Sequence, residues 1–168
     1  MESHNARAQP RADALLTHAA RLSHYARRLI EAAPRSGFDA GIERAFSAAE
    51  MRAALAAQPA DDEESLGRAL RVLRNQVMLR LIARDLGGLA DLREVMATVT
   101  ALAEIAIGHA LDKLDSWPDE QHGRPLGETT GAEQRLHVVG MGKLGGGELN
   151  VSSDVDLIFL YPEEGMTS

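Results

Sequence analysis

Two aspartates separated by one residue, Asp154 and Asp156, begin an apolar run near the end of the chain. Residues two apart on a strand project from the same face, so the two carboxylates are predicted to lie side by side. Such carboxylates repel each other unless a cation lies between them. Burying unpaired charges costs free energy, so two carboxylates at the start of an apolar strand indicate a specific role. The pattern indicates a divalent-cation site that could also hold the phosphates of a nucleotide.

A glycine-rich turn precedes the two aspartates and could bring the phosphates to them. It follows the apolar strand predicted over residues 136–139 and reads GMGKLGGG over residues 140–147. Glycines let a backbone approach a phosphate closely, because they have no Cβ and tolerate positive φ. Ser152 and Ser153 add hydroxyl and backbone donors for phosphate oxygens. Together these residues favour metal-assisted phosphoryl or nucleotidyl transfer.

Two familiar nucleotide-binding motifs do not account for the glycine turn. A P-loop requires a glycine where this chain has His137 and a serine or threonine where it has Leu144. The dinucleotide pattern G-x-G-x-x-G is formally present, but the next strand follows too soon for the helix that this fold requires. A dinucleotide-binding enzyme is therefore a distant third hypothesis.

Composition restricts the class of protein further. The 168 residues are 45% hydrophobic and 4% aromatic, and they contain no cysteine, which excludes disulfides and thiolate metal sites. The sequence shows no signal peptide and no run of 18 apolar residues, so we expect a soluble cytoplasmic protein without a membrane partner. Residues 101–168 carry 4 basic and 12 acidic residues, which argues against a nucleic-acid partner.

Helical periodicity dominates the chain before the glycine turn. It predicts four helices over residues 11–33, 42–57, 65–86 and 89–114, the last two long, with a turn at 34–41 and a polar loop at 119–131. The acidic run 61–64 could suggest a cation site, but acids in the first turn of a helix are better explained by its dipole.

Five arginines and one histidine on the long helices also need an interpretation. The arginines, at positions 68, 71, 74, 80 and 84, could contact phosphates or a nucleic acid. We favour a solvated face with arginine–acid pairs. His109 lies near the apolar stripe without a second histidine four residues on, so we interpret it as structural.

The segment GMGKLGGGELNVSSDVDLIFLYPEEG resembles the signature of the bacterial glutamine synthetase adenylyltransferase family, and more broadly the polymerase-β-like nucleotidyltransferase superfamily. The likeness runs from about Glu64 to Gly165 and is strongest over Val138–Tyr161. It implies a large enzyme with two catalytic halves, Mg²⁺ in a two-metal site, and ATP, ADP and phosphate as substrates. This sequence is more similar to the N-terminal catalytic half of these enzymes. By resemblance, that half removes AMP from a tyrosine of glutamine synthetase by phosphorolysis and releases ADP. The family also suggests a PII-type signalling protein and glutamine as regulators.

The resemblance implies a set of site residues, carried over position by position. They are Gly145, Gly146, Lys143 and Ser153 for the nucleotide phosphates, and Asp154 and Asp156 for the metal and for catalysis. One departure is Gly147, where the family usually has arginine; it removes a charge and is expected to loosen the turn. The other is the third carboxylate of the superfamily, which has no counterpart on a later strand, so we expect a truncated member that is inactive alone.

These observations predict an α+β fold in three parts. An all-α helical region over 1–118 and a polar linker loop over 119–134 precede the first strands of a polymerase-β-like nucleotidyltransferase domain over 135–168. The second strand, 155–161, is apolar on both faces and is predicted to be central in a sheet. A sheet of two strands is marginal, so this strand should pack on the helices or expose an apolar edge. The alternative function is an inactive remnant that only binds nucleotide, metal or a protein partner.

Overall fold

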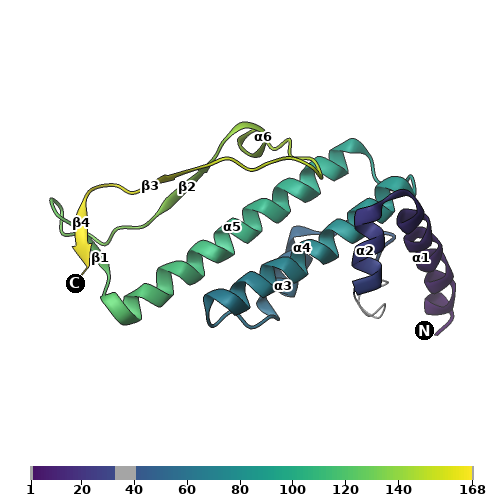
Figure 1. The fold of residues 1–168 in the computed structure, drawn as a ribbon, viewed down its shortest axis with the longest axis horizontal. Coiled ribbons are helices and arrows are strands. Elements are labelled where there is room, and N and C mark those ends of the chain that lie inside the picture. The colour runs from purple at the N-terminus through teal and green to yellow at the C-terminus, as the bar shows by residue number, and fades with distance from the viewer. Residues whose placement is uncertain (1, 33–40, 168) are drawn as a thin grey trace.

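The structure is a computed structural model that describes residues 2–32 and 41–167, with backbone alone at 2–10 and 118–122. The predicted turn at 34–41 therefore lies outside the described residues, except for Gly41. The helices are α1 (Glu2–Leu22), α2 (His24–Ala32), α3 (Ala48–Ala56), α4 (Glu63–Leu86), α5 (Leu92–His122) and α6 (Gly142–Gly145). The strands are β1 (Pro125–Gly127), β2 (His137–Gly140), β3 (Leu157–Leu160) and β4 (Gly165–Thr167). This order, a helical region followed by short strands, confirms the predicted α+β class (Figure 1).

Several predicted helix boundaries are wrong. The helix predicted over 11–33 is broken at Ser23, whose Oγ accepts a hydrogen bond from the Ala26 N–H at 3.2 Å and so starts α2. The last long helix does not end at 114–118 but continues through Pro118. It ends before Gly123, whose φ of 74° leaves the helical region. As a result, α5 extends into the segment predicted as a linker.

Side-chain caps fix the starts of α3 and α4. The Ser47 Oγ accepts from the Glu50 N–H while the Glu50 carboxylate accepts from the Ser47 N–H, so α3 starts at residue 48 rather than 42. Asp62 caps α4 in the same reciprocal way with Ser65. The acidic run 61–64 thus serves the start of a helix, as predicted.

Two apolar clusters hold the helices together, and α4 contributes to both. The first lies between α3, α4 and α5, and the second between α1, α2, Ile42 and α4. Within α4, Val77 belongs to the first cluster and Leu79 to the second, and neither is exposed to solvent. In Figure 1, α4 accordingly lies between α5 and the pair α1–α2. It is the central helix of the helical region.

Two of the five arginines on α4 are buried, which corrects the prediction of a solvated arginine face. Arg80 and Arg84 are 6% and 5% exposed, whereas Arg68 lies on the exposed face as expected. Buried guanidinium groups need hydrogen-bond partners. The Arg80 Nε donates to the Arg44 carbonyl at 2.9 Å, and the Arg84 Nη1 donates to the Ile42 carbonyl at 3.0 Å. The two arginines therefore fasten the segment before α3 to α4.

Strands β2 and β3 pair antiparallel, with His137 opposite Leu160 and Gly140 opposite Leu157. This pairing confirms the predicted hairpin-like start of a sheet, but the central position of the second strand is wrong. Ile158 and Phe159 are 43% and 57% exposed, because the sheet has two strands in the described part of the chain. The strand exposes an apolar surface, which was one of the two predicted outcomes.

The short strands β1 and β4 form a second antiparallel pair that the sequence did not predict. Leu126 of β1 lies opposite Met166 of β4, so the segment predicted as a polar linker contains a strand. Each strand has three residues, which is too short to show an alternating pattern. The pair forms one end of the molecule, beside the end of α5 (Figure 1).

One helix in the described ranges is long and apolar enough to cross a membrane by length and composition alone. It is the Leu92–Trp117 part of α5, with a mean hydropathy of 1.3 and 28% of its apolar window buried. The core helix of a soluble protein passes the same test, and α5 contributes Leu102 and Ile105 to the first apolar cluster. This packing covers part of its apolar surface.

Candidate functional site

The pairing of β2 with β3 places the glycine turn beside the two aspartates. The ladder ends at the Gly140–Leu157 pair, and the next N–H, that of Met141, donates to the Asp156 carbonyl at 2.9 Å. The turn starts directly after this bond. Two segments separated by more than ten residues are thereby joined at their backbones.

The glycine turn itself is a four-residue helix, α6, and not the long helix of a dinucleotide-binding fold. Its end is closed by two hydrogen bonds, from the Gly147 N–H to the Leu144 carbonyl at 3.1 Å and from the Glu148 N–H to the Lys143 carbonyl at 2.7 Å. This is the Schellman arrangement, which places its closing residue in the left-handed region. Gly147 has a φ of 70°, so it closes the turn, contrary to the expectation that it would loosen it.

Gly145 lies against the end of β2. A Cβ on this residue would lie 2.5 Å from the Gly140 carbonyl oxygen, too close for any side chain. Gly146, with a φ of −83°, adopts a right-handed conformation that other residues share. Gly145 is therefore required by packing in this structure, whereas Gly146 is open to substitution on conformational grounds. Lys143 is exposed on the same turn.

A tight turn at residues 150–153 leads to the aspartates. The Asn150 Oδ1 accepts from the Ser152 N–H at 3.0 Å and from the Ser152 Oγ at 3.1 Å. The Ser153 N–H donates to the Asn150 carbonyl at 3.1 Å, and the Ser153 Oγ accepts from the Asn150 N–H at 3.0 Å. Ser153, predicted to contact phosphate, thus first shapes the turn. Its hydroxyl proton remains available for a further acceptor.

Asp154 and Asp156 are exposed on the segment between this turn and β3. The prediction that both lie on the strand is wrong, because the turn occupies the chain up to residue 153 and β3 begins only at Leu157. Exposed carboxylates two residues apart fit a hard cation such as Mg²⁺, which prefers carboxylate oxygens and retains several waters. Within the ranges that the structure describes, no three His, Asp or Glu side chains form a group that could hold a metal.

The two acids that follow β3 are engaged elsewhere. The Glu163 carboxylate accepts from the Thr129 N–H at 3.0 Å and from both the N–H and the Oγ1 of Thr130. The Thr130 hydroxyl is the main cause that lowers the pKa of Glu163. The Glu164 carboxylate accepts from the Tyr161 hydroxyl at 2.8 Å, and this bond raises the pKa of Tyr161. Glu163 therefore fixes the loop after β1 to the segment before β4.

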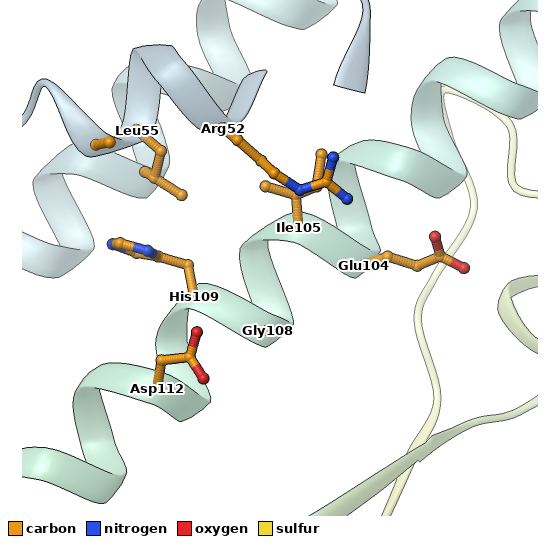
Figure 2. Close-up of a pocket in the computed structure, with 8 residues that line it drawn as sticks. Arg52, Leu55, Glu104, Ile105, Gly108, His109 and Asp112 are labelled. Atoms are coloured by element: carbon orange, nitrogen blue, oxygen red, sulfur yellow. The ribbon is translucent and has the colours of Figure 1, made fainter. Parts of the chain in front are cut away.

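A separate cavity of about 420 Å³ opens between α3 and α5, away from the glycine turn. Figure 2 shows Arg52 above it and Glu104, His109 and Asp112 along α5 below it. The His109 Nε2 is buried and has no hydrogen-bond partner among the described residues. Sequence reasoning interpreted His109 alone and missed this grouping, because Arg52 comes from another helix and only tertiary packing brings it close.

The site consists of a glycine turn, a polar turn and two exposed carboxylates, and one pair of strands joins these segments. Residues 13–168 match the family described as glutamate-ammonia ligase adenylyltransferase. The chain belongs to the glutamate-ammonia ligase adenylyltransferase family, which confirms the resemblance drawn from the sequence.

Several relatives carry the name bifunctional glutamine synthetase adenylyltransferase/adenylyl-removing enzyme. That of Nitrosomonas europaea is 62% identical over 109 residues, which cover 64% of this chain and 12% of the relative. Those of Chromobacterium violaceum and Ralstonia nicotianae are 48% identical over 157 residues and 44% over 165, each covering 92% of this chain and 17% of the relative. The chain thus spans between 12% and 17% of the length of these curated relatives.

Proposed function

We propose that residues 138–161 form the nucleotide- and metal-binding part of an adenylyl-transfer site that acts on glutamine synthetase. The observation that carries this proposal is the hydrogen bond from the Met141 N–H to the Asp156 carbonyl, at 2.9 Å. It joins the start of the glycine turn to the backbone of Asp156, which supports binding of one nucleotide by both segments. The names of the relatives support the same class of reaction.

Each residue of the site has a role in this proposal. Asp154 and Asp156 would hold Mg²⁺, which neutralises phosphate charge and orients an in-line attack when it is bound. Gly145 and Gly146 present backbone without side chains, so phosphates can approach closely. Lys143 adds an exposed positive charge, and the Ser153 hydroxyl donates to a phosphate oxygen.

The direction that we propose for this part of the enzyme is removal of AMP. An oxygen of inorganic phosphate attacks the phosphorus of the AMP attached to a tyrosine of glutamine synthetase. The bond between that phosphorus and the tyrosine oxygen breaks, ADP is released, and the tyrosine oxygen takes up a proton. Attachment of AMP from ATP would belong to the other catalytic half. We also propose a cytoplasmic location and a PII-type protein as a regulatory partner.

Calorimetric titration of the 168-residue chain with ADP, with and without Mg²⁺, tests the site. We expect Asp154→Asn and Asp156→Asn each to weaken Mg²⁺-dependent binding at least about tenfold. Asp85→Asn is the matched control, because Asp85 is an exposed carboxylate at the end of α4 and should leave binding unchanged. Binding that survives both substitutions, or that does not need Mg²⁺, would reject the proposal.

The direction of the reaction needs a protein of the relatives' length. Adenylylated glutamine synthetase is incubated with phosphate and Mg²⁺, and released ADP is measured. We expect Asp154→Asn and Asp156→Asn to abolish release of ADP while attachment of AMP from ATP continues. Loss of attachment with release intact would assign this segment to the opposite direction.

A second candidate function is a module that binds nucleotide, metal or a protein partner without catalysis. The number of metal ligands favours this candidate. Among the described residues, the site has two carboxylates for a metal and lacks the third carboxylate of the superfamily. The two candidates differ in the assay on the longer protein. A binding module would bind ADP through Asp154 and Asp156 but would leave both half-reactions unaffected when these aspartates are changed.

A further inference from the structure

A cavity of about 290 Å³ lies between α4, α5 and the turn that leads to the aspartates. Its helical walls are apolar and its third wall is the segment from Leu149 to Val155. Leu149 is 1% exposed and anchors that segment on the helices. The apolar residues that line the cavity are Leu70, Met78, Val99, Leu102, Ala103, Ala106, Leu149, Val151 and Val155.

The charged residues that line this cavity among the described residues are both arginines. Arg71 and Arg74 of α4 line it, and none of its lining residues is acidic. Arg74 is partly engaged, because its Nη1 donates to the Tyr25 hydroxyl at 2.7 Å. Arg71 is exposed and makes no hydrogen bond or ion pair within the described ranges. The cavity therefore offers an apolar interior with a free cation at its entrance.

The wall opposite the helices belongs to the candidate active site. Ser153 and Val155 both line the cavity, and Asp154 lies between them in the chain. Val151 and Val155 are 44% and 41% exposed, so apolar surface at the entrance remains uncovered. A ligand seated here would cover this surface and contact the chain on both sides of Asp154.

We propose that this cavity is a regulatory site for a small amphipathic anion, an aromatic or aliphatic body that carries one carboxylate or phosphate. The body fills the apolar interior, and the anionic group pairs with Arg71 at the entrance. The bound ligand fixes the backbone of residues 153–155 and thereby the position of Asp154. The cavity shares Ser153 with the proposed nucleotide site, but its ligand is held by α4 and α5 and its binding is tested without nucleotide.

Two probes of equal shape test the proposal: 2-naphthoate, which is anionic, and 2-naphthamide, which is neutral. Binding is measured by calorimetry and located by backbone amide shifts in NMR spectra. We expect naphthoate to bind more tightly than naphthamide, with shifts at Val99, Ala103 and Ser153. Arg71→Gln should weaken naphthoate about fivefold, as loss of one exposed ion pair does, and leave naphthamide unchanged.

Substitutions in the cavity and outside it separate this site from other apolar surface. Ala106→Phe fills the cavity and should weaken both probes at least about tenfold. Ala103→Leu serves the same purpose if circular dichroism shows that the first variant does not fold. Phe159→Ser, on the exposed strand β3, should leave naphthoate binding unchanged.

Three results would overturn the proposal. The first is equal affinity for the anionic and the neutral probe, which would remove the role of Arg71. The second is loss of binding in Phe159→Ser, which would place the probe on β3. The third is absence of naphthoate binding to the folded chain.

Discussion

Replacement of Arg84 by methionine should destabilise the helical region strongly. The Arg84 guanidinium donates to both oxygens of the Glu94 carboxylate, at 2.6 and 2.9 Å. It also donates to the carbonyls of Ile42 and Leu89, each at 3.0 Å. The Arg84 side chain is 6% exposed and that of Glu94 is 20% exposed. One substitution therefore breaks four hydrogen bonds and leaves a largely buried carboxylate and two carbonyls unpaired.

The expected cost is about 3–5 kcal/mol in the free energy of unfolding, the range for removing one partner of a buried ion pair. In a domain of this size, about 1 kcal/mol lowers Tm by about 2–4 °C, so Tm should fall by roughly 6–20 °C. Urea unfolding followed by circular dichroism measures the change in free energy. Arg84→Lys should give a smaller loss, because lysine keeps the charge but cannot form the two-pronged contact.

Arg68→Met provides a matched control on the same helix. Arg68 also contacts a glutamate, Glu64, at 2.6 Å, but these side chains are 66% and 81% exposed. A pair four residues apart on an exposed helix contributes only about 0.3–0.5 kcal/mol. If Arg84→Met costs no more than Arg68→Met, the reasoning from burial and from unpaired carbonyls is refuted. A double-mutant cycle with Glu94→Gln would then show whether Arg84 and Glu94 are coupled at all.

Four further outcomes are expected. Gly147→Ala should cost about 1–2 kcal/mol in urea unfolding, because its φ is 70°, while Gly146→Ala, at a φ of −83°, should cost little. Ser47→Ala should cost about 1 kcal/mol by removing the cap of α3. Hydrogen bonds lower the folded-state pKa of Glu163 below its ordinary 4.5. The ionised Glu163 therefore stabilises the fold above that pH, and this stabilisation is lost as pH falls through the lowered pKa. Glu163→Gln should lower the urea midpoint at neutral pH and match the wild type in strong acid. Phe159→Lys should reduce self-association in light scattering, since Phe159 is 57% exposed on an open strand.

The helices were largely predictable because apolar periodicity is a local signal. Helix α4 ends at Leu86, as its periodicity indicated, and its acidic start is capped by Asp62. The boundaries that failed depend on events that periodicity does not register. Ser23 breaks a helix through one hydroxyl contact, and Pro118 is tolerated inside α5. Both features depend on the conformation of a single residue. Apolar periodicity is averaged over many residues and does not detect them.

The buried arginines show a second limit of sequence reasoning. Arg80 and Arg84 lie on the same helix as Arg68 and have the same chemistry. What separates them is the chain that packs over them, the segment at 41–46, whose carbonyls accept their hydrogen bonds. These hydrogen-bond partners lie about 40 residues away in the chain, so the local spacing of residues on α4 does not reveal them. The same reason hid the grouping of Arg52 with His109.

The candidate site was readable from the sequence because local hydrogen bonds, rather than a core, shape it. The glycine turn is closed by bonds at Gly147 and Glu148, and the polar turn by four bonds between Asn150 and the two serines that follow it. Apolar burial contributes through Leu144 and Leu149, which are 7% and 1% exposed. Glycine, asparagine and serine form such turns by their own backbone preferences.

A site built in this way keeps its shape with few long-range contacts, so its residue types must recur at fixed spacing to preserve it. The helical region is under no such constraint, because many apolar residues can fill the same core volume. This difference explains why the resemblance to the family is strongest over Val138–Tyr161, although it extends back through the two long helices. It also predicts that the site's shape will resist core substitutions such as Val77→Ala, while Asn150→Ala, which removes the acceptor of the Ser152 bonds, will alter it without unfolding the helices.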